Sequence, residues 1–549
     1  MNRIRISAIA AIAAGAAAIH AASTRPAYTQ AKPDLVVLIA VDQFSAGLFD
    51  QWRGHFKSGL KRLMDEGIVY SSAYQSHGLT ETCAGHSTML TGKHPRGTGI
   101  VANEWFDTKA GDQVYCVEAA AFSTASNPDR HVGPTNLLAT TLGDWMKDQQ
   151  AMSRVVTVSG KDRASITMAG HHGDGVFWYE DNFGFTTYLA TGEDAAAKLA
   201  PLAELNAKIK AETASAPPWT YYEDSCRALE ADYQFGARTW HSKLPPENPS
   251  GANIRPVHLV DPYTMEAAHI LVDHFRLGRR GVTDLLAVSL SATDFVGHGY
   301  GTQGPEMCDQ LFRLDAQIGA FLTFLDGLGP RVLVVVTGDH GGSDFVERLA
   351  LRGFANARRI DSKALLAAIN AELKSKFALT ADPLVTPDFT QFYAVDDKKR
   401  ALGEPLRTKV IEVALAILNA RPEVEEAFSL KDLLSHKVKR SAQSDYSLRD
   451  RYALSVMDGR SGDIIVAFKS GIATLPTAVL MGHSGPYRSD TAVPIVFWWQ
   501  GMKGQTRILP VDTTMIAPTL ANIIDVKAPA DLDGTCFDLG FPGASKCTR

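Results

Sequence analysis

Four short runs of apolar, largely β-branched residues constrain the fold of this chain most. They are LVVLIAV (35–41), VVTVSG (155–160), LLAVSL (285–290) and VLVVVT (332–337). Continuous runs of this kind, without polar residues in alternation, are typical of strands buried on both faces of a sheet. Helical patterns separate the runs, so the sequence predicts an α/β fold with a mostly parallel central sheet and helices on both faces.

Apolar residues recur at helical spacing over 55–67 and over 305–329. Both segments end on a glycine, which is a common residue at the end of a helix. Two more helices are expected over 408–420 and 511–526. Alternating strands and helices place the active site of such a protein at the carboxyl ends of the strands.

Two regions, near 177–250 and near 388–470, fit the pattern of strands and helices poorly. The first is rich in aromatic residues, proline and alanine, and the second combines one helix with a polar, hairpin-like portion. We interpret both as insertions that form a cap over one catalytic domain spanning 33–549.

The first 22 residues have the pattern of a secretory signal peptide: a basic start, MNRIR, then an alanine-rich apolar stretch that ends in small residues. Cleavage is expected after Ala21 or Ala22. A membrane anchor is the alternative, but the run is short and weakly hydrophobic for a span. We therefore expect a periplasmic or secreted protein.

Composition narrows the possible partners. The chain is 45% hydrophobic and 21% charged, as is usual for a soluble globular protein, and its net charge is -5 with both signs mixed. It has no basic block that would indicate a nucleic-acid-binding surface. After residue 22 it has no stretch of about 20 apolar residues, so we expect no membrane span in the mature chain. The sequence gives no indication of the oligomeric state.

The six cysteines fit an exported protein. They are Cys83, Cys116, Cys226, Cys308, Cys536 and Cys547. An even number permits three disulfides in an oxidising compartment, but six cysteines allow 15 connectivities. The pairs 536–547, 83–116 and 226–308 are the ones we favour, and the connectivity stays open at this point. The chain contains no C-x-x-C pair, so a zinc–thiolate site has no support.

Carboxylates and imidazoles gather where the predicted strands end. The residues are Asp42 after the first run, Asp294 and His298 after the third, Asp339 and His340 after the fourth, and His483 in the later stretch MGHSGPY. Taken singly, an aspartate at a strand end often caps a helix, and a histidine is more often hydrogen-bonded than bound to a metal. Together they indicate metal binding. Imidazole and carboxylate without thiolate suit zinc, and six ligands suit two ions.

The stretch ETCAGHSTMLTGKHP (81–95) opens with small polar residues and then becomes helix-like. Thr82 is open to three interpretations, namely a helix N-cap, a metal ligand or a nucleophile. Two metal ions roughly 4 Å apart can clamp the attacking and leaving oxygens of a phosphoryl transfer, and a metal-bound threonine is then a credible nucleophile.

Five motifs resemble, in order, the metal motifs of the alkaline phosphatase superfamily. They are VDQ (41–43), ETCAGHSTMLTGKHPRGTGIVANEWFD (81–107), SATDFVGHGYG (291–301), VVTGDHGG (335–342) and MGHSGPYRSD (481–490). The resemblance is to the branch with a threonine nucleophile, which includes nucleotide pyrophosphatase/phosphodiesterases and PafA-like periplasmic alkaline phosphatases. It covers most of the mature chain and implies an alkaline-phosphatase-like fold.

The resemblance also implies roles for individual residues. Asp42, Thr82, Asp339 and His340 would hold one Zn²⁺, and Asp294, His298 and His483 would hold the second. Thr82 would be the nucleophile that forms a phosphothreonine intermediate with small-molecule phosphate esters. Asn103 matches the asparagine that hydrogen-bonds a phosphoryl oxygen. His86 matches no ligand and is expected to pack or hydrogen-bond near the nucleophile.

Lys161 and Arg163, in SGKDRAS after the second run, favour a monoesterase. A phosphate monoester carries a second negative charge that a diester lacks. A lysine together with the forked guanidinium of an arginine can bind that additional charge. The PafA-like group that the chain resembles carries this Lys-x-Arg pair. The alternatives are two ordinary surface residues, and a phosphodiesterase or nucleotide pyrophosphatase with the same metal site.

Three other interpretations carry less weight. Sulfatases share the fold, but CAGHS (83–87) lacks the proline and arginine of their C-x-P-x-R motif. A metal-stabilised binding protein without activity is disfavoured because all expected ligands and the nucleophile are present. The pair His171 and His172 lies beside glycines and before VFWYEDNFG, so we expect a loop over the cleft rather than a metal site.

Overall fold

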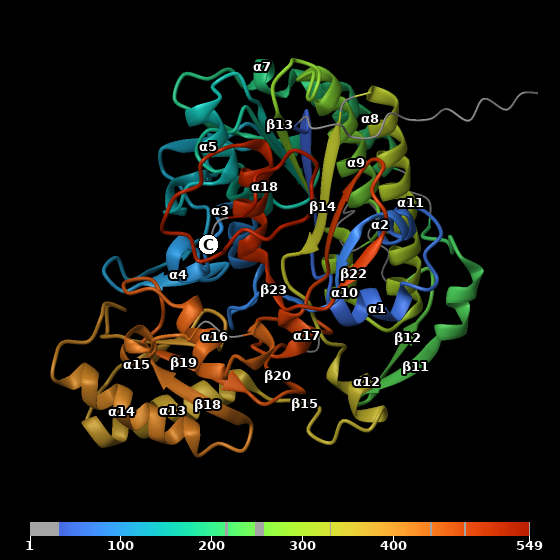
Figure 1. Cartoon of the computed structure of the whole chain (residues 1–549). Coiled ribbons are helices and arrows are strands. Elements are labelled where there is room, and N and C mark those ends of the chain that lie inside the picture. Colours follow the sequence, from blue (N-terminus) through green and yellow to red (C-terminus); the bar gives the residue numbers. More distant parts are fainter. Residues whose placement is uncertain are drawn as a thin grey trace, which may run out of the picture.

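The computed structural model describes residues 32–214, 218–246, 257–329, 331–439, 442–476 and 479–547. The expected signal peptide, residues 1–22, lies outside the described residues. A large sheet runs through the middle of the main body, and helices cover both of its faces (Figure 1). The predicted α/β class is confirmed.

The described part of this sheet has nine strands, and its centre is parallel, with β14, β1, β13, β7 and β8 running in one direction. In spatial order the strands are β22 (Gln505–Arg507), β2 (Ile68–Tyr70), β21 (Ile495–Trp499), β14 (Val332–Gly338), β1 (Leu35–Val41), β13 (Asp284–Leu290), β7 (Val155–Ser159), β8 (Gly175–Glu180) and β9 (Gly184–Thr186). β21 and β9 pair antiparallel with their neighbours. The four apolar runs of the sequence are therefore the four adjacent strands β14, β1, β13 and β7.

β1 shows why its run lacks polar residues. Its alternate residues enter different cores: Val36 and Leu38 pack on one side of the sheet, and Val37 and Ile39 pack on the other. The first core includes residues of α3 (Thr82–Thr91), α5 (Leu142–Gln149) and α18 (Ile516–Ile524). The second includes residues of α2 (Gly59–Glu66), α9 (Val260–His274) and α11 (Pro305–Leu328). Full burial of each such side chain stabilises the fold by roughly 1.5–3 kcal/mol.

Residues 358–476, which we call the small unit, project from one end of the main body (Figure 1, yellow to orange ribbons). They contain an antiparallel sheet in the order β16 (Leu384–Val385), β17 (Gln391–Ala394), β19 (Ile464–Phe468) and β18 (Val424–Ser429). α13 (Ser362–Phe377) and α14 (Leu406–Asn419) share a separate hydrophobic core with this sheet. β15 (Arg358–Arg359) and β20 (Ile472–Ala473) pair at its base. The division into one domain with two insertions stays a prediction.

Two sequence expectations differ from the structure. The aromatic segment from Phe177 begins in β8, a buried strand of the central sheet, so the first poorly fitting region does not start there. The C-terminal helix α18 begins at Ile516 rather than at 511, because Val511–Asp512 forms a short strand beside Ala73–Tyr74. In both cases a buried apolar segment was compatible with either state, and pairing with a neighbour decided it.

All three favoured disulfides are present: Cys83–Cys116, Cys226–Cys308 and Cys536–Cys547.

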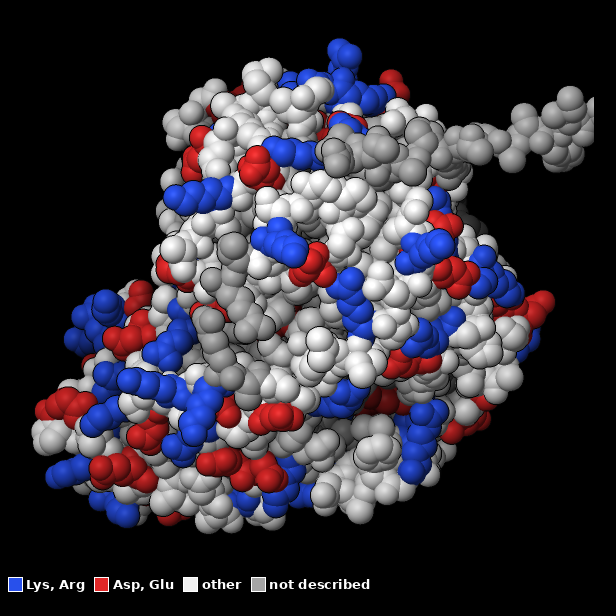
Figure 2. Space-filling view, viewed as in Figure 1, with Lys and Arg blue, Asp and Glu red and all other residues white. Residues whose placement is uncertain are grey.

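Among the described helices, none combines the length and hydropathy that a membrane crossing needs. On the face drawn in Figure 2, basic and acidic side chains are interspersed over both the main body and the small unit.

Candidate active site

The carboxyl ends of β1, β13 and β14 bring three predicted ligand groups to one edge of the sheet. Asp42 directly follows β1, and Asp339 and His340 directly follow β14. After β13, the chain enters α10 (Ala292–Tyr300), where Asp294 and His298 stand one helical turn apart. His483 comes from the loop between β20 and α17 (Arg488–Thr491).

These residues form two groups that could each hold a metal ion: Asp42, Asp339 and His340 in the first, and Asp294, His298 and His483 in the second. Within each group one ligand atom per residue lies within 4.8 Å of the others. The groups are neighbours, because the imidazole rings of His340 and His483 stack with their centroids 3.8 Å apart. The six carboxylate and imidazole side chains among the predicted ligands therefore lie together, as the sequence indicated.

Backbone carbonyls orient all three imidazoles in the same way. The Nδ1 atoms of His298, His340 and His483 lie 2.8, 2.9 and 2.8 Å from the carbonyl oxygens of Met481, Gly341 and Thr80. A carbonyl accepts only, so Nδ1 carries a hydrogen, and in the neutral ring the lone pair stands on Nε2. Nε2 faces the carboxylates in each case, for example at 3.2 Å from Asp294 Oδ1 in His298. This is the usual outer hydrogen bond of a metal-binding histidine.

The first group also has the unpaired polar atoms that a cation would satisfy. Within the described part of the chain, neither Asp42 Oδ1 nor His340 Nε2 has a hydrogen-bond partner, although both residues are fully buried. Buried polar atoms are rarely left unpaired, because each costs free energy. The donor set of carboxylates and imidazoles without sulfur fits a divalent metal ion such as zinc.

Burial controls the protonation of these ligands. It lowers the pKa of His340, and it lowers the pKa of His483 well below its usual value, with repulsion from His340 adding to the effect. Both rings are therefore neutral, which is the form that binds metal. Burial opposes ionisation of Asp294, but His298 and Lys161 overcome it and hold the pKa of this carboxyl well below its usual range.

Thr82 is the first residue of α3, and every residue of this helix is buried. The helix lies unusually close to the end of β14: a Cβ on Gly85 would be 2.0 Å from the carbonyl oxygen of Asp339. Glycine at this position therefore permits the approach that brings Thr82 to the metal-binding groups. The N-cap is Glu81 rather than Thr82, so the capping interpretation of Thr82 is wrong.

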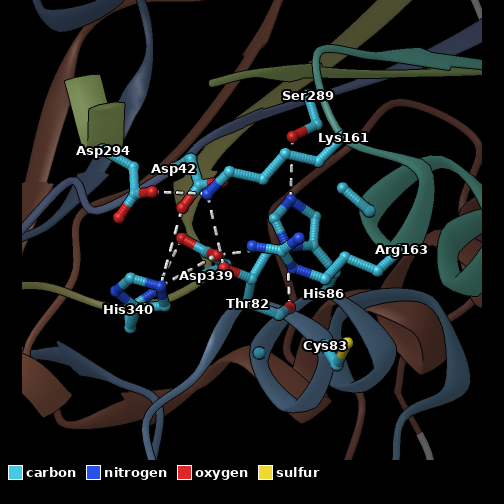
Figure 3. A network of polar contacts seen from close by, with 12 residues as sticks. Asp42, Thr82, Cys83, His86, Lys161, Arg163, Ser289, Asp294, Asp339 and His340 are labelled. Atoms are coloured by element: carbon cyan, nitrogen blue, oxygen red, sulfur yellow. Dashed lines mark hydrogen bonds and ion pairs between the residues drawn. The ribbon is translucent and has the colours of Figure 1, made fainter. Parts of the chain in front are cut away.

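Lys161 connects Thr82 with both groups. Its Nζ lies 2.6 Å from Asp42 Oδ2, 2.5 Å from Asp294 Oδ2 and 3.5 Å from Thr82 Oγ1. Figure 3 shows the side chain extended between the two aspartates. Only 3% of Lys161 is exposed, which excludes the interpretation of a surface lysine.

Arg163 lies two residues further on, in α6 (Asp162–Ala169), and a chain of hydrogen bonds holds it. Its guanidinium donates to the Tyr115 hydroxyl at 3.5 Å, and that hydroxyl donates to Asp162 Oδ1 at 2.7 Å. Although burial opposes it, the neighbouring Tyr115 and Asp162 raise the pKa of Arg163, so the side chain stays charged. Sequence reasoning did not find Tyr115, which belongs to no quoted motif, and it gave no role to Asp162, although this residue lies between Lys161 and Arg163 in SGKDRAS.

A hydrogen bond ties Asn103 to the start of α3. Its Oδ1 accepts the backbone N–H of Cys83 at 2.9 Å, which leaves the NH₂ group as the side chain's donor. Glu81 accepts the backbone N–H of Asn103 at 2.6 Å and the Ser484 hydroxyl at 3.2 Å. Glu81 is another residue missed by the sequence interpretation, although its position directly before Thr82 was a signal.

Two more buried residues support the site. His86 Nδ1 lies 2.9 Å from the carbonyl oxygen of Thr82 and 3.1 Å from Asp339 Oδ2, so His86 hydrogen-bonds beside Thr82 as expected (Figure 3). Gln43 was missed: its N–H donates to Asp339 Oδ1 at 3.0 Å, and its Nε2 donates to Asp294 Oδ1 at 2.9 Å. Gln43 thus links the two metal-binding groups, and its φ of 61° is unusual for a residue other than glycine.

A cleft of about 820 Å³ opens beside the second group. Asn103, Arg163, His298 and His483 line its inner end, and the small unit supplies the opposite wall. His171 does not belong to it: it hydrogen-bonds Asp144 in the main body and lines a different cavity, so the expectation of a loop over the cleft is wrong for this residue.

Comparison with known proteins identifies several relatives. The profile of the family described as "Type I phosphodiesterase / nucleotide pyrophosphatase" matches residues 36–475. Alkaline phosphatase PhoK of Sphingomonas is 35% identical over 518 residues, covering 92% of this chain and 91% of that protein. Alkaline phosphatase PhoD of Zymomonas mobilis is 34% identical over 532 residues, covering 93% and 89%.

A solved structure is similar over nearly the whole chain. The crystal structure of wild-type alkaline phosphatase PafA superposes with a TM-score of 0.81 at 25% sequence identity. The match covers 92% of this chain and 98% of that one. The unmatched part of this chain is smaller than the small unit, so the match extends over both the main body and the small unit.

Proposed function

This chain belongs to the type I phosphodiesterase/nucleotide pyrophosphatase family, within the alkaline phosphatase superfamily, and from this premise we propose that it is an alkaline phosphatase with a threonine nucleophile and two zinc ions. Its substrates are small-molecule phosphate monoesters. The observation that carries the proposal is the position of Lys161, which contacts both metal-binding groups and lies 3.5 Å from the Thr82 hydroxyl.

In this proposal Asp42, Thr82, Asp339 and His340 hold one ion, and Asp294, His298 and His483 hold the other. When bound, zinc lowers the pKa of a nearby hydroxyl and neutralises negative charge on a phosphoryl group. Hydrogen bonds between Nδ1 and backbone carbonyls fix the rings of His298, His340 and His483 so that their Nε2 atoms would be available to the ions, and Gln43 keeps Asp294 and Asp339 in place.

The protein's own residues then carry out the transfer in two steps. Thr82 Oγ1 loses its proton to solvent and attacks phosphorus in line, and the bond from phosphorus to the ester oxygen breaks as that oxygen takes up a proton from solvent. The alcohol leaves, and a phosphothreonine remains. Water attacks the same phosphorus in the second step, which releases inorganic phosphate and returns the Thr82 hydroxyl.

Lys161, Arg163 and Asn103 hold the non-bridging oxygens while charge shifts among them. Lys161 and Arg163 supply two positive charges in a buried setting, where they act more strongly than in water. A monoester dianion gains more from these charges than a diester monoanion does. The NH₂ group of Asn103 adds a neutral donor.

The test compares monoester and diester hydrolysis in the double variant Lys161→Ala/Arg163→Ala. We expect its kcat/KM for a monoester to fall by about 10²-fold or more, with a much smaller change for a diester. The matched control, Lys208→Ala/Arg279→Ala, removes one lysine and one arginine from the outside of the main body and should behave like the wild type. Equal losses for both substrates would contradict the monoesterase assignment.

The family match favours one alternative, a phosphodiesterase or nucleotide pyrophosphatase with the same metal site. That enzyme would hydrolyse a diester faster than a monoester before any substitution.

The three disulfides also support export, and we propose that the protein works in the periplasm or outside the cell.

A further inference from the structure

The cleft beside the second metal-binding group is much larger than a phosphate group requires. Its volume of about 820 Å³ lies within the roughly 300–1,000 Å³ of pockets that bind organic molecules. One end is polar and holds Asn103, Arg163, His298 and His483. The space beyond these residues must therefore accommodate the part of the substrate that leaves.

The far side of the cleft comes from the small unit, where five apolar residues stand among the polar residues Asp361, Ser362, Lys363, Asp388, Thr390 and Thr474. We call the surface of these five residues the apolar wall, and it consists of Ile360, Pro387, Phe389, Leu475 and Pro476. Its side chains are partly exposed rather than sealed in the core. Exposed apolar surface beside fixed polar groups is the usual composition of a site for an organic ligand.

The apolar wall is anchored to the loop that carries a proposed metal ligand. A Cβ on Gly482 would be 2.4 Å from Leu475 Cδ1, so this leucine lies against the residue before His483. The Arg359 guanidinium donates to the carbonyl oxygens of Leu475 and Val479 at 3.2 Å each. An ion pair with Glu347 at 2.6 Å fixes Arg359 in turn. The distance between wall and metal group is thus set by the fold.

Phe389 occupies an unusual backbone conformation in this wall. Its φ is 64°, a left-handed value that is an outlier for a bulky residue. Two contacts hold the turn: the N–H of Phe389 donates to Thr386 Oγ1, and Asp388 Oδ1 accepts the N–H of Thr390, both at 2.8 Å. Such strain persists where surrounding bonds enforce it, and it concentrates at functional sites.

The direction of the cleft agrees with the proposed chemistry. Of the described residues, His298 and His483 line the cleft, whereas Thr82 does not. In-line attack places the leaving group on the side of phosphorus opposite Thr82. The leaving group would therefore extend past these two histidines toward the apolar wall.

We propose that the apolar wall is a leaving-group subsite for aromatic rings, which makes aryl phosphate monoesters the preferred substrate class. The inference rests on the proposed function, because it uses the same phosphate-binding end of the cleft. The ring of Phe389 can stack on an aryl group, and Ile360 and Leu475 supply further apolar contact. The benefit is specificity for the leaving group, separate from recognition of phosphate.

The test measures binding of two non-hydrolysable phosphonates to the zinc-loaded protein by titration calorimetry. Methylphosphonate reports the phosphate end alone, and phenylphosphonate adds the ring. We expect phenylphosphonate to bind about tenfold more tightly in the wild type. Phe389→Gly, which removes the ring and relieves the positive φ, should bring the two affinities together and leave that of methylphosphonate unchanged.

Leu475→Ala provides a second variant in case the turn at Phe389 does not fold, and it should also reduce the ratio of affinities. Phe354→Gly removes an exposed phenylalanine outside the cleft and should keep the wild-type ratio. Equal affinities for the two phosphonates in the wild type would overturn the inference about the apolar wall but not the proposed function. The same would follow if the ratio of the affinities stayed at the wild-type value in both variants. If neither phosphonate bound, the phosphate end itself, and with it the proposed function, would be refuted.

Discussion

At the scale of single residues, the hydroxyl of Thr82 does not serve as the helix cap that its position suggests. A threonine at a helix start usually caps the first turn, but the cap position belongs to Glu81, and Lys161 Nζ lies 3.5 Å from Thr82 Oγ1. The hydroxyl is therefore not used as a cap, which agrees with the proposed role in the reaction.

Substitution of Thr82 separates these roles. Thr82→Ala should lower kcat by about 10³-fold or more, because no oxygen remains to form the phosphoenzyme. Its melting temperature should stay close to that of the wild type, since no cap is lost. Thr82→Ser keeps the hydroxyl and serves as the control that retains turnover. Rapid-quench detection of phosphoprotein checks the result, and a phosphoenzyme in Thr82→Ala would refute the assignment.

The site shows what sequence can and cannot provide at this scale. Asp42, Asp339 and His340 could be placed together, because each ends a strand and parallel strands end at the same edge. Gln43 and Tyr115 could not be found in this way. Their contribution is a hydrogen bond to another residue, and this depends on distances that no motif records.

At the scale of elements, the position of α3 depends on Gly85. A Cβ at this residue would stand 2.0 Å from a backbone oxygen of Asp339, and a backbone cannot move aside as a flexible side chain can. Gly85→Ala should therefore destabilise the protein by about 1–3 kcal/mol and weaken turnover more than tenfold, as Thr82 shifts. Thermal unfolding and kcat measure the two effects.

Gly47→Ala is the matched control. Gly47 also lies in a helix, α1 (Ala46–Trp52), but the nearest atom to an added Cβ is 3.9 Å away. This substitution should be neutral or slightly stabilising, because alanine favours helix. A wild-type melting temperature and activity in Gly85→Ala would show that the close approach has no importance.

The first turn of α11 contains a carboxyl whose titration affects stability. Burial raises the pKa of Glu306 from 4.5 to about 7, and its side chain accepts the Ser242 hydroxyl at 3.0 Å. Between these pH values the folded chain holds a proton that the unfolded chain has lost. The free energy of unfolding therefore falls as pH rises through this window, by on the order of 2 kcal/mol from this group.

Glu306→Gln should remove this part of the pH dependence, because glutamine resembles the protonated acid but does not titrate. Urea unfolding of both proteins at pH 5 and pH 8 gives the comparison. The difference in unfolding free energy between the two pH values should be smaller in the variant. An identical difference would mean that Glu306 is ionised throughout in the folded protein.

The elements themselves were predictable to different degrees. β1 matches its apolar run at both ends, because a strand buried on both faces has apolar residues throughout. α11 matches the helical pattern to within one residue, because a helix buried along one stripe has apolar residues at helical spacing. β8 was hidden in an aromatic segment that fits strand or insertion equally well. Its state depends on pairing with β7, which lies outside the segment.

At the scale of the whole molecule, the small unit and the main body build one cleft together. The sequence indicated an irregular region near 388–470 and placed it over the sheet. It gave no means of knowing that Phe389 and Leu475 would face the same space as His483. Contacts between residues so far apart in the chain follow from tertiary packing alone.

The disulfide Cys83–Cys116 joins two parts of the candidate active site that come from different segments of the chain. Cys83 directly follows Thr82, and Cys116 directly follows Tyr115, which supports Arg163. Cys83→Ser/Cys116→Ser should therefore lose more kcat than Cys536→Ser/Cys547→Ser, whose bond closes only a short C-terminal loop. Steady-state kinetics and zinc content measured on both variants give the answer, and equal activities would contradict the expectation.

This crosslink also has a bearing on the life of the newly made chain. While thiols stay reduced, Thr82 and the residues that support Arg163 would lack their covalent tie, and under the proposed function full hydrolytic power would arise only after oxidation. A cell that synthesises the protein would thereby protect its own phosphorylated metabolites from it until the chain has left the cytoplasm.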